Sequence, residues 1–428
     1  MNDRRRVRSR LVTFAAALTT LVTLACTVPV SAQTYQVIHD FNGDDGIGPF
    51  SGLTADGRGN FYGTTAGGGS EEDDGTIYKL SRRGTSWMVT SLYGFSYRGS
   101  GGYSPIGRVV FGPNGSLYGT TSSGGSGCGG VGCGVVFRLT PPPTACPTTS
   151  CPWIEHVLHR FADNGQDGNY PYSEVVFDRN GNLYGTTTQG GTNGLGPNGL
   201  GTVYEITPSG VESVIYSFTG EDDGEIPEAP VILDAAGNLY GTTFIGMNGD
   251  GGGSAYELSP TQSGFQIHVL HNFFNEGLPV GGLLFDNLGN LYGTTSSGGL
   301  QGGGTVWELA GGTIFSTLWN IAGTPGNGPS SSLVMDASGN LYGANLGDYN
   351  RDRGSIFKLS FAGGTWNYTD LHDFAGGADG SNPNGPLTID AQGNIYGTTQ
   401  RGALAAAVLG AALSSRLCRK FVRKRSIS

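Results

Sequence analysis

The chain repeats one short sequence seven times. The string Gly-Asn-Leu-Tyr-Gly-Thr-Thr occurs at residues 181–187, 237–243 and 289–295, and near-copies occupy residues 59–65, 115–121, 339–345 and 393–399. The tyrosines of successive copies are 50 to 66 residues apart. A period of this length, with strand-like residues and turn signals in each copy, is typical of a propeller in which every repeat builds one blade.

One repeat reads as four short strands. Residues 175–178 form a first strand, Asp178 and Gly181 suit the first and fourth positions of a tight turn, and residues 183–187 form the second strand. A Gly-rich loop leads to a third strand at 202–206, and residues 214–218 form the fourth. A blade buries both faces only against its neighbours, so each blade presents nearly the same surface. The repeated Tyr, Gly and Thr are therefore predicted to be architectural, with each Gly leaving room for an aromatic ring.

The strand count predicts how the ring closes. Seven segments resemble a fourth strand, and the earliest, residues 37–41, precedes every first strand. We therefore expect an all-β, seven-bladed β-propeller of four-stranded blades, in which the N-terminal strand completes the last blade and removes an exposed sheet edge. Third strands number only six, because the repeat breaks after Thr399. The last blade is predicted to have three strands, at 387–390, 395–399 and 37–41, with the tail forming a helix or an extension outside the ring.

The two ends differ from the repeats in composition. A basic start, an apolar stretch and a small-residue cleavage site predict a secretory signal peptide over residues 1–32, with a retained membrane anchor as the alternative. The propeller is assigned to residues 33–402. Residues 403–428 form an apolar and then basic tail, interpreted either as a sorting or anchor segment or as a frameshifted end.

Charge is distributed unevenly along the chain. Residues 33–402 hold all but one of the 34 acidic residues but only 13 of the 24 basic residues. An acidic body repels nucleic acid and anionic membranes. We therefore expect no nucleic-acid partner, and contact with a membrane only through the termini.

The repeats resemble those of a bacterial family of exported proteins, the GloVer-repeat proteins, whose bodies carry different C-terminal anchors. The likeness rests on the D-x-x-G-N-L-Y-G-T-T core, complete at residues 234–243, on the L-H-D-F strand and on the G-x-D-G-x-x-P loops. It extends from about Tyr35 to Thr399. The resemblance implies an exported protein that is extracellular or at the cell surface. It implies no particular catalytic activity.

The sequence shows no motif of an ordinary hydrolase or nucleotide enzyme, since G-x-S-x-G, H-E-x-x-H and a phosphate-binding loop are absent. Four histidines share a fourth-strand position that holds Tyr or Trp in the other copies, which indicates packing rather than a metal ligand. We expect a binding or scaffold module for an extracellular glycan or protein, with no catalytic residues. The alternative is a metal-dependent lyase or lactonase, in which carboxylates and histidines of several blades converge on the central channel.

Acidic loops suggest a weak cation site. The loops after the second strands and the connectors between blades emerge on one face, and a rigid scaffold often displays binding residues in such loops. Oxygen-rich, flexible loops suit Ca²⁺, which extracellular modules bind with dissociation constants of about 10⁻⁴ to 10⁻³ M. Simple solvation of the charges is the alternative. The predicted ligands are Glu71, Glu72, Asp73, Asp74, Glu221, Asp222, Asp223 and Glu225.

Four cysteines lie around one third strand in two C-x4-C pairs. In an exported protein such a cluster predicts disulfides, whereas in a cytosolic protein it would suggest zinc. Two bridges are expected, and three connectivities are open. The residues are Cys128, Cys133, Cys146 and Cys151.

Overall fold

A computed structural model describes residues 34–69, 74–98, 101–125, 127–142, 153–193, 199–246, 251–322, 328–347, 353–401 and 405–409. These residues are almost entirely strands and loops; the helical segments among them are two 3₁₀ turns, Cys128–Gly130 and Gly377–Asp379. No helix in this part of the chain is long and apolar enough to cross a membrane. The all-β prediction is confirmed. The predicted signal peptide at 1–32 and residues 410–428 of the tail lie outside the described residues.

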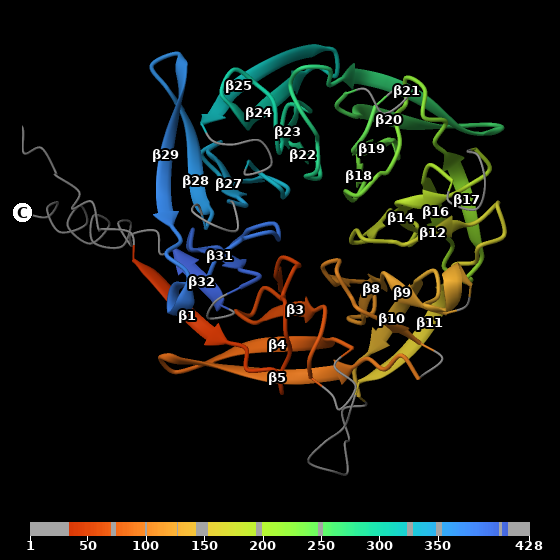
Figure 1. Ribbon diagram of the computed structural model, residues 1–428, viewed down its shortest axis with the longest axis horizontal. Coiled ribbons are helices and arrows are strands. Elements are labelled where there is room, and N and C mark those ends of the chain that lie inside the picture. Colours follow the sequence, from red (N-terminus) through yellow and green to blue (C-terminus); the bar gives the residue numbers. More distant parts are fainter. Residues whose placement is uncertain are drawn as a thin grey trace, which may run out of the picture. The chain divides into compact units, whose positions relative to one another are not determined.

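Six blades are each built from four antiparallel strands in sequence order (Figure 1). The first two blades contain β2 (Thr54–Ala55), β3 (Phe61–Thr65), β4 (Thr76–Arg83), β5 (Ser86–Gly94), then β7 (Val110–Phe111), β8 (Leu117–Thr121), β10 (Val135–Thr140) and β11 (Ile154–Arg160). The next two contain β13 (Val176–Phe177), β14 (Leu183–Thr187), β16 (Thr202–Ile206), β17 (Glu212–Ser217), then β18 (Ile232–Leu233), β19 (Leu239–Thr242), β20 (Ser254–Thr261) and β21 (Gly264–Asn272). The last two contain β22 (Leu284–Phe285), β23 (Leu291–Thr295), β24 (Gly302–Ala310), β25 (Ile314–Ala322), then β26 (Val334–Met335), β27 (Leu341–Asn345), β28 (Ser355–Ala362) and β29 (Thr365–Asp373). Two small strand pairs lie in the loops: β6 (Gly102–Tyr103) with β9 (Ser123–Gly124), and β12 (Gly168–Asn169) with β15 (Gln189–Gly190).

A further four-stranded sheet joins segments from both ends of the described chain. Its order is β1 (Tyr35–Asp40), β32 (Ala405–Leu409), β31 (Ile395–Thr398) and β30 (Thr388–Ile389). The N-terminal strand is outermost in this sheet, which confirms its predicted place. The structure thus has six blades that are continuous in sequence, one fewer than the seven predicted, and a composite sheet made from the two ends.

The prediction for the first part of the tail is wrong. Residues 405–409 form an antiparallel strand in which Leu409 lies opposite Ile395 on one side and Tyr35 on the other, and the pairing with β1 has a register shift between Val37 and Asp40. A helix or an outer extension was expected from the Ala- and Leu-rich composition. Helix propensity differs by less than about 1 kcal/mol per residue among ordinary residues. The unpaired N–H and C=O groups of the two flanking strands outweigh that preference, because a strand between them satisfies both edges.

In six of the seven copies the glycine of the repeated string faces an aromatic ring on the third strand. A Cβ atom at Gly293 would lie 2.2 Å from the ring of Trp307, and one at Gly185 would lie 2.3 Å from the hydroxyl of Tyr204. Both rings are completely buried. The predicted role of this glycine is therefore confirmed: any side chain would collide with the ring.

In six of the seven copies the first threonine of the string forms a bond to the neighbouring blade, whereas the copy at residues 339–345 has Ala344 at this position. The Thr120 hydroxyl donates to the carbonyl of Ser173 at 2.8 Å, and that of Thr186 donates to the carbonyl of Ala229 at 3.0 Å. Equivalent bonds start from Thr64, Thr242, Thr294 and Thr398. Because these bonds cross between blades, the repeated threonine is part of the packing of the ring.

An aspartate follows the first strand in six of the seven copies and holds the turn, and Gly112 takes its place in the second blade. Asp234 Oδ1 accepts the N–H groups of Ala236 and Asn238 at 2.8 and 2.9 Å, and its Oδ2 accepts the side-chain amide of Asn238 at 2.8 Å. Burial by itself would raise the pKa of Asp234, but these hydrogen bonds outweigh it and lower the pKa. The same pattern at the other copies confirms the turn interpretation; these are Asp56, Asp178, Asp286, Asp336 and Asp390.

Candidate ligand-binding site at the centre of the ring

A cavity of about 610 Å³ is lined by all six blades and by the composite sheet. Its wall consists mainly of the connectors that precede the first strands, together with Phe244, Ser296 and Leu346, which follow second strands. These are the loops of the face on which binding was expected. A concave, mostly apolar site with a few polar groups is the usual form of a ligand pocket. The polar lining residues are Ser51, Arg108, Tyr172, Ser173, Glu174, Glu228, Ser296, Ser330, Ser331, Ser332 and Asn384.

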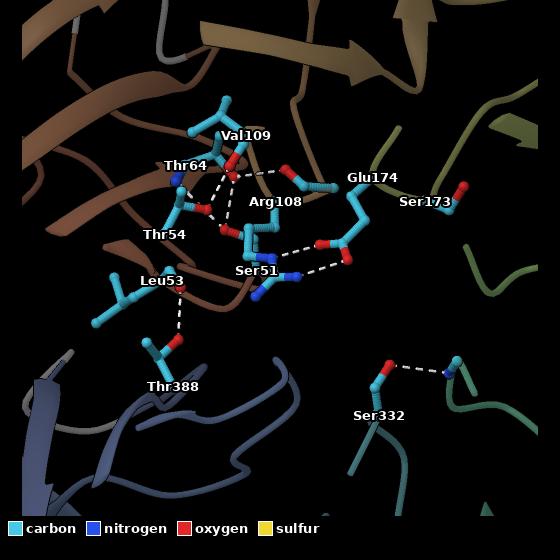
Figure 2. A network of polar contacts seen from close by, with 12 residues as sticks. Ser51, Leu53, Thr54, Thr64, Arg108, Val109, Ser173, Glu174, Ser332 and Thr388 are labelled. Carbon is cyan, nitrogen blue, oxygen red and sulfur yellow. Dashed lines mark hydrogen bonds and ion pairs between the residues drawn. The ribbon is translucent and has the colours of Figure 1, made fainter. Parts of the chain in front are cut away.

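Arg108 and Glu174 form a two-pronged ion pair between the second and third blades (Figure 2). Arg108 Nη2 donates to Glu174 Oε1 at 2.7 Å, and Nε donates to Oε2. The side chains are 26% and 14% exposed. Burial by itself would lower the pKa of Arg108, but the charge and hydrogen bond of Glu174 raise it. The pair is therefore a fixed, charge-balanced part of the wall.

Glu228 contributes a second carboxylate to the cavity, from the connector before the fourth blade. Burial raises the pKa of its carboxyl. Burial and, after it, the charge of Glu228 raise the pKa of Tyr172, which lines the same cavity and is 37% exposed. The two side chains offer an acceptor and a hydroxyl to a polar ligand.

The wall from the sixth blade carries three consecutive serines. Ser332 Oγ accepts the backbone N–H of Gly282 at 2.9 Å. The hydroxyls of Ser330 and Ser331 are buried and have no hydrogen-bond partner among the described residues. Burying a hydroxyl without a partner is unfavourable. These two hydroxyls are therefore unsatisfied polar groups of residues that line the cavity.

The metal-dependent lyase or lactonase alternative needs carboxylates and histidines of several blades, and the described lining of the cavity holds two carboxylates and no histidine. Its titratable lining residues are Arg108, Tyr172, Glu174 and Glu228. Glu174 is already paired with Arg108, and metal centres in proteins use several carboxylates or histidines together. Within the described lining, Glu228 is the one carboxylate outside an ion pair.

The first loop predicted to bind Ca²⁺ is mostly outside the described residues. This applies to Glu71, Glu72 and Asp73. Asp74 is described, and its Oδ2 accepts the backbone N–H of Tyr97 at 2.7 Å. Of the four residues predicted in this loop, Asp74 therefore forms a hydrogen bond within the protein.

The second predicted loop is described in full. Asp223 is buried, and its oxygens accept the hydroxyls of Tyr216 and Thr219 at 2.8 and 2.6 Å. Glu221 and Asp222 are exposed, and burial raises the pKa of Glu225. No three of the described members of the two loops bring their oxygens together as a metal site. Calcium binding stays a prediction.

One of the two predicted disulfides is confirmed. Cys128 and Cys133 are bonded, with Cα atoms 5.2 Å apart. Cys146 and Cys151 lie outside the described residues, so their pairing stays a prediction. The bond closes the loop that precedes β10.

Rings on the fourth strands bind the aspartates of the following connectors. His39 Nε2 lies 2.8 Å from Asp45, and His372 Nε2 lies 3.1 Å from Asp379. Tyr216 makes the equivalent bond to Asp223. The packing role inferred for these histidines therefore includes a hydrogen bond that holds the connector.

Sequence reasoning missed one cluster that combines such a pair with a third residue. His159, Asp167 and Glu212 each place a ligand atom within 4.8 Å of the others, the one group of three of this kind among the described residues. Spacing along the chain gave no signal, because Glu212 belongs to the next blade. The available signal was a glutamate at a strand position that is apolar in most repeats.

Comparison with known proteins identifies the family. The chain matches the family model of the Gloeobacter/Verrucomicrobia repeat over residues 23–248 and 231–407. No curated protein sequence matches it significantly. Among solved structures it is similar to PorZ, a bacterial surface component of the type-IX secretion system of Porphyromonas gingivalis, with 15% identity, a TM-score of 0.50, and coverage of 88% of this chain and 48% of PorZ.

Two further similar structures are putative lactonases. One, from Bacteroides uniformis, is a putative 6-phosphogluconolactonase with 14% identity and a TM-score of 0.49, covering 77% of this chain and 86% of that one. The other is a putative gluconolactonase with 11% identity and a TM-score of 0.45, covering 89% and 92%. At these identities the likeness concerns the fold alone. The family match, in contrast, spans the repeats that build the blades, and the chain therefore belongs to the Gloeobacter/Verrucomicrobia repeat family.

Proposed function

We propose that this protein is an exported bacterial binding module whose central cavity takes a neutral, hydroxyl-rich ligand, a segment of an extracellular glycan. The observation that carries the proposal is the pair of buried, unpartnered hydroxyls of Ser330 and Ser331 in a cavity that also holds Glu228. Sugar hydroxyls can accept from the serines and donate to the carboxylate. Apolar lining such as Phe50 and Phe244 suits the C–H faces of a sugar ring.

Charge favours a neutral ligand over an anionic one. The chain has a formal net charge of −10 at pH 7, and the arginine of the cavity is already paired with Glu174. An anionic polysaccharide would meet Glu228 without a free cation beside it among the described lining residues. Like-charge contacts of this kind oppose binding.

The composite sheet is part of this proposal as the seventh blade of the ring. The ring of Tyr35 on β1 stacks on His372 of the sixth blade at 3.8 Å, and Thr398 on β31 bonds to Ser51 before the first blade. The sheet therefore contacts the blades on both sides. Such closure keeps all the connectors of the cavity at fixed positions.

Export and surface attachment complete the proposal. They are supported by the basic and apolar N-terminal residues and by the basic tail. Fractionation of cells that express the full chain, or a chain ending after Ala411, tests the attachment. If both forms partition equally into the medium, the tail is not an anchor.

Titration calorimetry of the full chain against neutral and anionic polysaccharides tests the binding function. Glu228→Gln is expected to weaken binding about tenfold, since it removes a charge-assisted hydrogen bond. Glu221→Gln, which changes an exposed acid of a loop, is the matched control and should bind as the wild type does. Equal losses in both variants, or no binding of any neutral polysaccharide, would contradict the proposal.

A metal-dependent lactonase is the alternative from the sequence, and the described cavity lining gives it little support. It is tested by adding a sugar lactone with and without divalent metal ions to the same preparations. Metal-dependent hydrolysis that Glu228→Gln abolishes would replace the binding proposal with an enzymatic one.

A further inference from the structure

A mixed cluster of an imidazole and two carboxylates lies between the second and third blades. His159 is on β11, Asp167 is in the connector that follows it, and Glu212 is on β17. His159 Nε2 lies 3.1 Å from Asp167 Oδ2 and 3.9 Å from Glu212 Oε2. The side chains are 20%, 9% and 15% exposed, respectively. The cluster is thus largely buried, and His159 is its most exposed member.

Internal comparison of the repeats separates the architectural part of this cluster from the unusual part. The bond between histidine and aspartate recurs at His39 and at His372, so by itself it is explained by the fold. The glutamate is different. Glu212 lies opposite Ile206 of the third strand in its own blade. From this position its side chain faces His159, the ring on the fourth strand of the preceding blade.

Apolar or aromatic residues hold this register position in five other sheets. They are Val89, Ile267, Phe315, Tyr368 and Tyr35. Phe315 stacks on His271 at 3.8 Å, as Tyr35 does on His372. In the second blade the position holds Glu155, which accepts the hydroxyl of Tyr93 at 2.8 Å. At Glu212 a carboxylate therefore replaces the apolar or aromatic side chain that packs on the histidine elsewhere. The histidine it faces, His159, also contacts Asp167.

The protein groups leave this glutamate under-satisfied. Glu212 Oε1 is buried and has no hydrogen-bond partner among the described residues. Burial raises the pKa of the Glu212 carboxyl, His159 lowers it, and Asp167 raises it further. Two carboxylates with one imidazole carry an uncompensated negative charge, and a buried charge without a partner is unfavourable. A divalent cation with neutral His159 would balance the two carboxylates.

We propose that His159, Asp167 and Glu212 bind a divalent first-row transition metal ion that joins the second and third blades. Ligand atoms that share a tetrahedral zinc ion are about 3.3 Å apart, given bonds of about 2.0 to 2.1 Å. The observed 3.1 and 3.9 Å bracket this value, and all three ligand atoms lie within 4.8 Å of one another. The imidazole favours zinc, copper, iron or nickel over calcium, which prefers oxygen ligands alone. The site lies between outer strands and is separate from the cavity lining.

Zinc titration of the full chain, after removal of metal with a chelator, tests the site. Wild type is expected to bind zinc at this site with a dissociation constant below 1 mM, and Glu212→Gln should weaken that binding at least tenfold. Two matched controls are available: Glu155→Gln changes the equivalent residue of the second blade, and His372→Gln changes a histidine that has only an aspartate. Both should bind zinc as the wild type does. Cobalt substitution should give a visible absorption band that Glu212→Gln removes.

Stability measurements distinguish the site from a general folding defect. Without metal, Glu212→Gln should melt at or above the wild-type temperature, because it removes a buried charge. With zinc the order should reverse, because binding to the folded state stabilises the wild type. The proposal would be overturned if Glu212→Gln bound zinc as tightly as the wild type. It would also be overturned if the wild type showed no zinc binding with a dissociation constant below 1 mM.

Discussion

The hydroxyl of Thr398 donates a hydrogen bond of 2.7 Å to the carbonyl oxygen of Ser51. Both residues are buried. The bond joins the last copy of the repeated string to the connector of the first blade, and Thr120 makes the same kind of bond to Ser173 within the ring. The two ends of the propeller are therefore joined by the contact that already links neighbouring blades.

Replacing Thr398 with valine should lower the free energy of unfolding by about 1–3 kcal/mol, because the Ser51 carbonyl loses this partner while it remains buried. Unfolding in urea measures the loss. The control is Thr369→Val, an exposed position on β29, which should change little. Equal effects of the two changes would show that the Thr398 bond does not stabilise the closure.

Gly293→Ala should destabilise the protein by about 1–3 kcal/mol, the usual cost of overpacking a core. The new Cβ would lie 2.2 Å from the Trp307 ring. Gly397→Ala is the matched change in the last copy, where the near atom is Leu387 Cδ2 at 2.8 Å, the end of a flexible side chain. Thermal unfolding should therefore show a clearly smaller loss for Gly397→Ala, and the reverse order would be inconsistent with this packing.

Tyr256→Phe should leave stability unchanged or increase it. The Tyr256 hydroxyl is completely buried and has no partner among the described residues, and Phe137 occupies the equivalent position in the second blade. Tyr342→Phe is the contrasting change, since that hydroxyl donates to Asp336 at 2.9 Å, and it should cost about 1 kcal/mol. Chemical denaturation of both variants checks the contrast. A marked loss for Tyr256→Phe would indicate an unseen partner.

The stability contributed by His271 should decrease in mild acid. Burial lowers the pKa of His271 in the folded state, although Glu276 opposes this. The unfolded chain then binds a proton more readily than the folded one, so stability is lost as the pH falls below about 6.5. His271→Tyr, which copies Tyr216 of the third blade, removes this component. Unfolding free energies at pH 8 and pH 5 should show the variant gaining relative to wild type, and a constant difference would refute the assignment.

The mature protein should contain no free thiol among its four clustered cysteines. Alkylation without reductant, followed by mass spectrometry, should leave Cys128, Cys133, Cys146 and Cys151 unmodified. The bond between Cys128 and Cys133 supports half of this expectation. Modification of Cys146 and Cys151 would instead favour a metal-binding role for that pair.

The sequence alone determined the repeating unit and its packing. Gly293 and Trp307, or Asp234 and Asn238, lie within one repeat, so copies of one short string show which residues must be small, aromatic or turn-forming. The same reasoning placed residues 37–41 in the closing sheet. It failed at residues 405–409, where local composition favours a helix while two distant strand edges impose a strand.

Tertiary structure decided which side chains meet between blades. Ser330, Ser331 and Glu228 come together in the central cavity because their connectors belong to different blades of one ring. Glu212 reaches His159 for the same reason, and neither contact follows from spacing along the chain. Local hydrogen bonding and steric fit repeat with the sequence, whereas a site between blades depends on the closed arrangement of the sheets, which no single repeat contains.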